Sequence, residues 1–201
     1  MKVNNLEIIK PLINNCKEGE FYLLLIIHRP KDGVTKFDKD GNKNHQKTIK
    51  SYYVSNAEYL EKKMDEIMAL CELFNARAYI NLNKKSWKQI TGKSIEILGH
   101  CVIKDEWKHA RSVIDSACGE TGACDGKKSY LVDVDTKDES EVEVITKSLY
   151  DSRPIGDKIV AKIPTVHGCH LITRGFNPED FRKFYPKEID IHKNNPTLLY
   201  C

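Results

Sequence analysis

The order of strands and helices in the last third of the chain restricts the choice of fold more than any other feature. Apolar runs and alternating patterns predict strands, and apolar residues at helical spacing predict helices. The predicted segments are a strand over 130–135 (YLVDVD), a helix over 140–150, strands over 158–164 and 168–174, a short helix that Asn177 or Pro178 opens and that ends near 184, and a final extended segment made of 188–191 and 197–200. The order is therefore strand, helix, strand, strand, helix, strand.

This order is typical of an α+β fold, the ferredoxin-like or RRM-like (RNA-recognition-motif-like) βαββαβ arrangement. We expect residues from about 127 to 201 to form such a core, packed against an N-terminal α/β module. The glycine-rich stretch 116–126 (SACGETGACDG) predicts either a joint between the two parts or a flexible loop beside a site. The predicted domains are therefore 1–118 and 119–201, and both can belong to one compact unit.

The N-terminal module is predicted from patterns of the same kind. Its expected segments are a strand over 21–28, a long polar hairpin loop over 29–47, a strand over 48–54, a helix that Asn56 caps and that ends near 75, a strand over 77–82, and helices over 86–98 and 104–117.

Composition and charge are those of an ordinary soluble globular protein. The 201 residues include 32 Lys and Arg against 29 Asp and Glu, and a net charge of +3 does not by itself indicate nucleic-acid binding. The longest apolar run, 21–27, has the length of a strand, and the N-terminal residues lack the apolar region of a signal peptide. We therefore expect a cytoplasmic protein with no membrane partner. Its size suits a small replication protein of a bacterium, a phage or a mobile element.

Seven scattered cysteines predict free thiols. An odd number without any CxxC pair is typical of a reduced compartment and not of a disulfide framework. A zinc site is the alternative to inert core and loop residues, and it would use Cys118 and Cys124 with His100, Cys101 and His109 upstream.

Four chemically active residues are expected to converge on one face of the predicted core sheet. In a βαββαβ sheet the first and third strands are central neighbours, and the fourth strand flanks the first. Residues two apart on a strand share a face, so Asp133 and Asp135 point the same way, with His170 on the third strand and Asp190 on the fourth. Carboxylates this close repel one another, and the hard divalent cations Mg²⁺ or Mn²⁺ stabilise them. Two such ions are the usual apparatus of in-line phosphoryl transfer.

Positive charge near these carboxylates would bind the phosphates of a nucleotide. His170 is placed to hydrogen-bond a triphosphate oxygen. Arg174 falls on the same face as His170, and Lys162 lies on the preceding strand. We expect both to add positive charge at the nucleotide.

Three motifs in the predicted core resemble those of the archaeo-eukaryotic primase superfamily, which includes primase-polymerases and the polymerase domains of bacterial end-joining ligases. The motifs are an apolar run before Asp-x-Asp (131–135, LVDVD), a small-x-His that opens a strand (168–170, GCH), and an apolar residue before Asp (Ile189 and Asp190). The resemblance covers about the last third of the chain. It implies a modified ferredoxin-like core beside an α/β module.

The same resemblance implies a DNA primase or polymerase that transfers nucleotides on a template. A 3′-hydroxyl would attack the α-phosphate of an incoming NTP or dNTP. Asp133, Asp135 and Asp190 are the implied catalytic and metal-binding residues, and His170 is the implied phosphate ligand. The implied cofactor is Mg²⁺ or Mn²⁺. The implied partners are a DNA or RNA template with its primer, and a helicase or another replication protein.

Two other functions are compatible with the sequence. A non-catalytic nucleic-acid-binding module reads bases with aromatic residues on its central strands, whereas these strands carry carboxylates and a histidine. A metal-dependent phosphohydrolase or nuclease would use the same carboxylates to activate water.

Basic residues beside the third predicted strand offer a path for a nucleic-acid backbone. Arg77, Lys84 and Lys85 can follow template phosphates there, and an ordinary solvated surface is the alternative.

Overall fold

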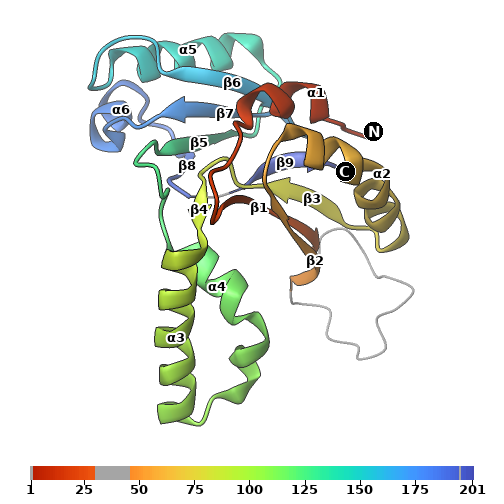
Figure 1. Ribbon diagram of the computed structural model, residues 1–201. Helices are drawn as coiled ribbons and strands as arrows, with labels where there is room; N and C mark the ends of the chain where they lie inside the picture. The colour runs from red at the N-terminus through yellow and green to blue at the C-terminus, as the bar shows by residue number, and fades with distance from the viewer. Residues whose placement is uncertain (1, 30–45, 195) are drawn as a thin grey trace.

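Two antiparallel sheets and six α-helices make up the described part of this mixed α+β chain (Figure 1). The structure is a computed structural model that describes residues 2–29, 46–194 and 196–201. Most of the hairpin loop predicted over 29–47 lies outside these residues. The first sheet contains β1 (Glu20–His28), β2 (Lys47–Val54), β3 (Arg77–Ile80), β4 (Lys85–Ser86) and β9 (Thr197–Tyr200), and the second contains β5 (Ser129–Val134), β6 (Ile159–Pro164), β7 (Cys169–Arg174) and β8 (Asp190–His192). The helices are α1 (Leu6–Ile9), α2 (Ala57–Leu73), α3 (Trp87–Lys104), α4 (Val113–Glu120), α5 (Glu139–Asp151) and α6 (Pro178–Phe184), with 3₁₀ turns at Lys10–Leu12 and Trp107–Ser112.

The second sheet is built from the segments predicted for the core, and its strand order is β6-β7-β5-β8. Alternate side chains of β5 and β7, including Val132, Val134 and Leu171, are buried on one face against α5 and α6. The side chains of Asp138 and Asn177 cap the N-termini of these two helices. Because both helices cover the same face, the other face of the sheet is turned toward the rest of the molecule.

The first sheet has the strand order β2-β1-β3-β9, and β4 pairs with the start of β1. β1 is apolar along both faces because both faces are covered over part of its length. Leu24 and Ile26 lie in one core cluster with Leu60 and Ile67 of α2. On the opposite face, Phe21 lies in a second cluster at the base of α3.

The end of the chain joins the two sheets. The final extended segment predicted from the sequence is split, because β8 pairs with β5 whereas β9 pairs with β3. Residues 197–200, predicted as part of the core, therefore add a strand to the sheet of the predicted N-terminal module. The buried Asn5 side chain donates to the backbone oxygens of Pro164 (2.9 Å) and Leu198 (3.0 Å), which fastens α1 to both sheets.

Helices α3 and α4 form an arm that extends away from the two sheets (Figure 1). Aromatic rings hold its base, with the Trp87 ring centroid 4.4 Å from that of Phe21 and 4.7 Å from that of Tyr53. The sequence predicts helices over 86–98 and 104–117, whereas α3 runs on to Lys104. It ends there because Asp105 adopts a left-handed conformation with φ 57°, and a 3₁₀ turn separates α3 from α4.

Candidate functional site

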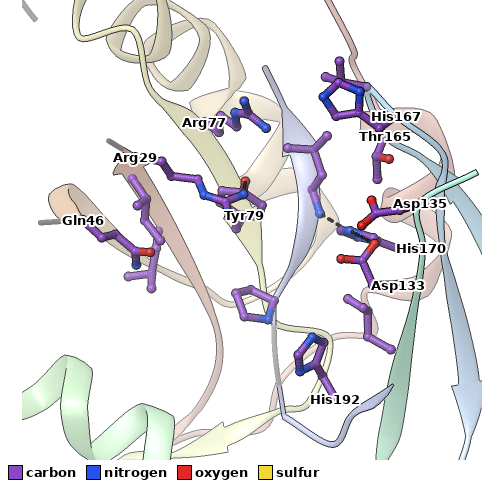
Figure 2. Close-up of a pocket in the computed structure, with 16 residues that line it drawn as sticks. Arg29, Gln46, Arg77, Tyr79, Asp133, Asp135, Thr165, His167, His170 and His192 are labelled. Carbon is purple, nitrogen blue, oxygen red and sulfur yellow. Dashed lines mark hydrogen bonds and ion pairs between the residues drawn. The ribbon is translucent and has the colours of Figure 1, made fainter. Parts of the chain in front are cut away.

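A cleft of about 440 Å³ opens between the two sheets, and each sheet supplies one of its walls. Figure 2 shows Asp133, Asp135 and His170 on the wall formed by the second sheet, with Arg29 and Tyr79 on the wall formed by the first. Apolar side chains that also line the cleft are Leu25, Ile27, Leu131, Val166, Pro196 and Leu198. We call the first of these surfaces the core wall and the second the facing wall.

The core wall carries two carboxylates from the end of β5. Asp133 lies inside β5 and Asp135 directly follows it, so the strand periodicity turns both side chains to the same face. Asp133 is half-buried and Asp135 is exposed. Burial, reinforced by repulsion from Asp135 and Asp190, raises the pKa of Asp133 above its usual value. Negative charge is therefore concentrated at this end of β5.

The close approach of Gly168 to β5 fixes the backbone that carries Asp135. A Cβ atom on Gly168 would lie 1.9 Å from the Val134 carbonyl oxygen, 2.8 Å from Thr136 N and 2.9 Å from Thr136 O. The turn itself is closed by Thr165, whose N–H donates to Gly168 O at 2.9 Å and whose Oγ1 accepts from Gly168 N at 3.0 Å. The small residue of the second motif is therefore required by contact with the strand of the first motif.

His170 lies directly opposite Asp133 in the register of β5 and β7. Its Nδ1 is 2.9 Å from Thr197 Oγ1 and accepts from Leu198 N at 3.4 Å. Because a backbone N–H only donates, Nδ1 is the acceptor and the neutral ring carries its proton on Nε2. Nε2 lies 3.5 Å from Asp133 Oδ1. Burial lowers the pKa of His170 to about 4, so the ring is neutral at physiological pH and offers Nε2–H as a donor.

The facing wall of the cleft carries positive charge. Arg77 and Tyr79 come from β3, and Arg29 directly follows β1. The Arg29 guanidinium donates from Nη1 to the Tyr79 hydroxyl at 3.1 Å. Of these two arginines, the sequence pattern predicts a binding role for Arg77 but not for Arg29. Arg29 lies two residues beyond Ile27 on the same strand face, but the sequence did not reveal that this face meets the core.

Asp190 lies beside the cleft and does not line it. It is directly opposite Asp133 in the register of β5 and β8, and its side chain is exposed. It lines a neighbouring depression that it shares with Asp133 and Asp135. The three predicted carboxylates are therefore neighbours, with Asp190 on the outer side.

Arg174 and Lys162 stand further away. Arg174 shares the face of His170 but lies at the far end of β7, where it pairs with Ser129 and is exposed. Lys162 pairs with Leu171 and therefore projects from the sheet face on which α5 and α6 pack. The structure brings neither of these predicted phosphate ligands into the cleft.

Lys84 and Lys85 are held by contacts elsewhere in the fold and do not line the cleft. Lys84 Nζ donates to the backbone oxygen of Asn15 at 3.0 Å. Lys85 is fully buried, and its Nζ donates to Thr121 O and to Asn194 Oδ1 at 2.8 Å. Of the three basic residues predicted to follow a nucleic-acid backbone, only Arg77 lines the cleft.

Burial of Lys85 makes the stability of the fold depend on pH in a defined direction. Desolvation lowers the pKa of Lys85 to about 8 in the folded state. Above that pH the unfolded chain holds more protons at this residue than the folded chain, so the free energy of unfolding rises with pH toward the ordinary lysine pKa. We expect urea unfolding to show this rise between pH 7.5 and about 9.5, and Lys85→Met to remove it. The exposed Lys88→Met is the control, and an equal rise in all three proteins would contradict the assignment.

Within the described residues, no group of three or more His, Cys, Asp or Glu side chains is arranged to hold a metal ion. Of the residues in the zinc alternative, the His109 side chain lies outside the described part, and burial raises the pKa of the Cys118 thiol to about 11, which disfavours the thiolate that zinc binds. Asp133 and Asp135 do fit a hard divalent cation. Magnesium is usually held by one or two carboxylates together with water and substrate phosphates, and it does not need a preformed protein cage.

Comparison of the chain with protein-family models, with curated proteins and with solved structures finds no match. None of the helices in the described ranges combines the length and the hydropathy that a bilayer span requires.

Proposed function

We propose that this protein is a template-dependent nucleotidyltransferase of the primase-polymerase type. The observation that carries the proposal is the meeting of Asp133, Asp135 and His170 on one wall of a cleft between two sheets. In the proposed reaction a primer 3′-hydroxyl attacks the α-phosphate of an NTP or dNTP. The strand grows by one nucleotide, and pyrophosphate leaves.

The topology of the second sheet supports this proposal. The strand order β6-β7-β5-β8, with α5 and α6 on one face, is the arrangement expected of a ferredoxin-like βαββαβ core. In it, β5 lies between the strands that carry His170 and Asp190. The resemblance to the primase superfamily implies metal and phosphate ligands at these positions.

The side chains have the chemistry that the proposed roles demand. Asp133 and Asp135, with Asp190 beside them, would hold Mg²⁺ or Mn²⁺, and such ions when bound neutralise phosphate charge and activate a hydroxyl. His170 is aimed by Thr197 and Leu198 so that its Nε2–H points toward the carboxylates. An N–H donor in this place can hydrogen-bond an oxygen of the triphosphate. Because the His170 ring is neutral, it would bind that oxygen without adding positive charge.

The proposed partners follow from the reaction. They are a nucleic-acid template with its primer, a nucleoside triphosphate, and a helicase or another replication protein that exposes single-stranded template.

The products formed from a labelled primer test the proposal. The protein is incubated with a 5′-labelled primer on a longer template, with Mg²⁺ or Mn²⁺ and either NTPs or dNTPs. We expect the primer to lengthen with the sequence that the template dictates and one pyrophosphate to appear per added nucleotide. A shortened labelled strand would instead identify a nuclease. An unchanged primer that stays bound without metal would identify a non-catalytic nucleic-acid-binding module.

A further inference from the structure

The wall that faces the carboxylates carries Arg29, Arg77 and Tyr79. We infer that Arg29 and Arg77 bind phosphate groups of the ligand that occupies the cleft, and that Tyr79 is the positioning residue that holds Arg29 for this contact. The identity of that ligand as a nucleotide or a nucleic-acid strand rests on the proposed function, whereas the phosphate chemistry rests on the facing wall itself.

The register of the first sheet brings the three side chains to the same surface. Leu25 pairs with Tyr79, and Ile27 pairs with Arg77, so these four residues share one face of the antiparallel pair. Arg29 continues the same face of β1 two residues beyond Ile27. All five residues line the cleft.

Tyr79 gives Arg29 a defined position. Its hydroxyl accepts from Arg29 Nη1 at 3.1 Å. Among the residues that the structure describes, no other hydrogen bond holds this guanidinium, so its remaining N–H groups can donate to a ligand. Figure 2 shows the Arg29 side chain lying along the facing wall beside Tyr79, across from Asp133. A guanidinium already held by one hydrogen bond loses less conformational freedom when it binds an anion.

The two walls carry opposite charge, and this suits a phosphate ligand that bridges them. Within the described residues, Arg29 hydrogen-bonds Tyr79 and does not bond the carboxylates across the cleft. If Asp133 and Asp135 held divalent cations, a phosphate group bound there would still have oxygens that face the opposite wall. The planar guanidinium of arginine matches such oxygens well, because it can donate two hydrogen bonds to a phosphate.

Phosphate groups of this kind have two sources, a nucleoside triphosphate and a nucleic-acid backbone. Two probes that do not react separate them. The first is 2′-deoxyadenosine 5′-(α,β-imido)triphosphate with Mg²⁺, and the second is a fluorescent twelve-nucleotide oligothymidylate without metal. Calorimetry measures the first and fluorescence anisotropy the second, over a series of salt concentrations.

The variants are Arg29→Gln, Arg77→Gln and Tyr79→Phe in the full chain. The matched control is Arg182→Gln, which removes the same charge from an exposed position on α6. Thermal unfolding of every variant verifies that it is folded. Each arginine variant is expected to bind at least one probe about tenfold more weakly than wild type, and the control is expected to bind both normally. If the oligonucleotide is the probe affected, its logarithmic salt slope should fall by about one per arginine removed.

A double-mutant cycle tests the positioning role of Tyr79. Tyr79→Phe keeps the ring and removes the acceptor of Arg29, so it should weaken binding in the wild-type background and have no further effect in Arg29→Gln. If the arginine variants bind the nucleotide probe more weakly, the facing wall contacts the triphosphate. If they bind the oligonucleotide more weakly, it contacts the nucleic-acid strand. Normal binding of both probes by both arginine variants would overturn the inference. If these variants lose binding but the wild type extends no primer, the phosphate site stands and the proposed function fails.

Discussion

Asp133→Asn should lower primer extension by about 10³-fold or more without lowering the stability of the fold. The asparagine keeps the size and shape of the aspartate but removes the charge through which a divalent cation would be held. The same charge is unfavourable to folding, because burial and the neighbouring Asp135 and Asp190 disfavour the ionised form of Asp133. We therefore expect the free energy of unfolding in urea at pH 7 to be unchanged or slightly higher, as is common when a functional charge is removed.

The control for this variant is Asp65→Asn, which removes one carboxylate charge from an exposed position on α2. It should leave primer extension at the wild-type level. If Asp133→Asn retained full extension, Asp133 would not belong to the catalytic site. If it unfolded at much lower urea than wild type, Asp133 would be a structural residue of β5.

Gly168→Ala should damage both stability and activity. Its Cβ would meet three backbone atoms of residues 134 and 136, the nearest at 1.9 Å, and backbone atoms cannot turn aside as a flexible side chain can. Either β5 or the turn before β7 must shift, at a cost of about 3 kcal/mol of stability, near the upper end for overpacking. Asp135 lies between the displaced residues, and a displacement of the order of 1 Å is enough to lower turnover by about 100-fold.

Gly92→Ala is the matched substitution for this test. Gly92 lies inside α3, and beyond its chain neighbours and the adjacent helix backbone a Cβ there would meet nothing within 4 Å. Alanine at that position should raise stability by up to about 1 kcal/mol, because glycine weakens a helix interior, and should leave activity unchanged. The free energies come from urea unfolding and the activities from initial extension rates. If Gly168→Ala and Gly92→Ala had the same stability and the same extension rate, contact between residue 168 and β5 would not be what requires glycine in this turn.

Much of the core wall of the cleft could be predicted from the sequence, because it depends on local pattern and strand order. The alternation along β5 shows that Asp133 and Asp135 share a face. The order of the segments makes β7 and β8 the neighbours of β5, and this is enough to bring His170 and Asp190 beside Asp133. The catalytic role of these residues is a separate matter and stays a proposal.

The rest of the site depends on contacts between distant segments, which periodicity does not report. β9 has an apolar pattern that suits either sheet, and its pairing with β3 is decided by tertiary packing. The sequence predicts that Lys85 lies on the surface, as most lysines do. It is buried instead, and Thr121 O and Asn194 Oδ1 accept hydrogen bonds from its ammonium group. Arg29 lines the cleft only because the face of β1 that carries it lies opposite β5 in the folded chain.

The most direct test of the central claim is template-directed extension of a labelled primer by wild type and by the Asp133→Ala/Asp135→Ala double variant. Each of four templates, differing only in the first unpaired base, is offered each single nucleotide with Mg²⁺ or Mn²⁺. We predict that wild type adds the complementary nucleotide on each template, that addition requires the metal, and that the double variant adds none while keeping the circular dichroism spectrum and the unfolding midpoint of a folded protein. Extension by the double variant at the wild-type rate, or no metal-dependent addition by wild type on any template, would contradict the claim that this cleft transfers nucleotides.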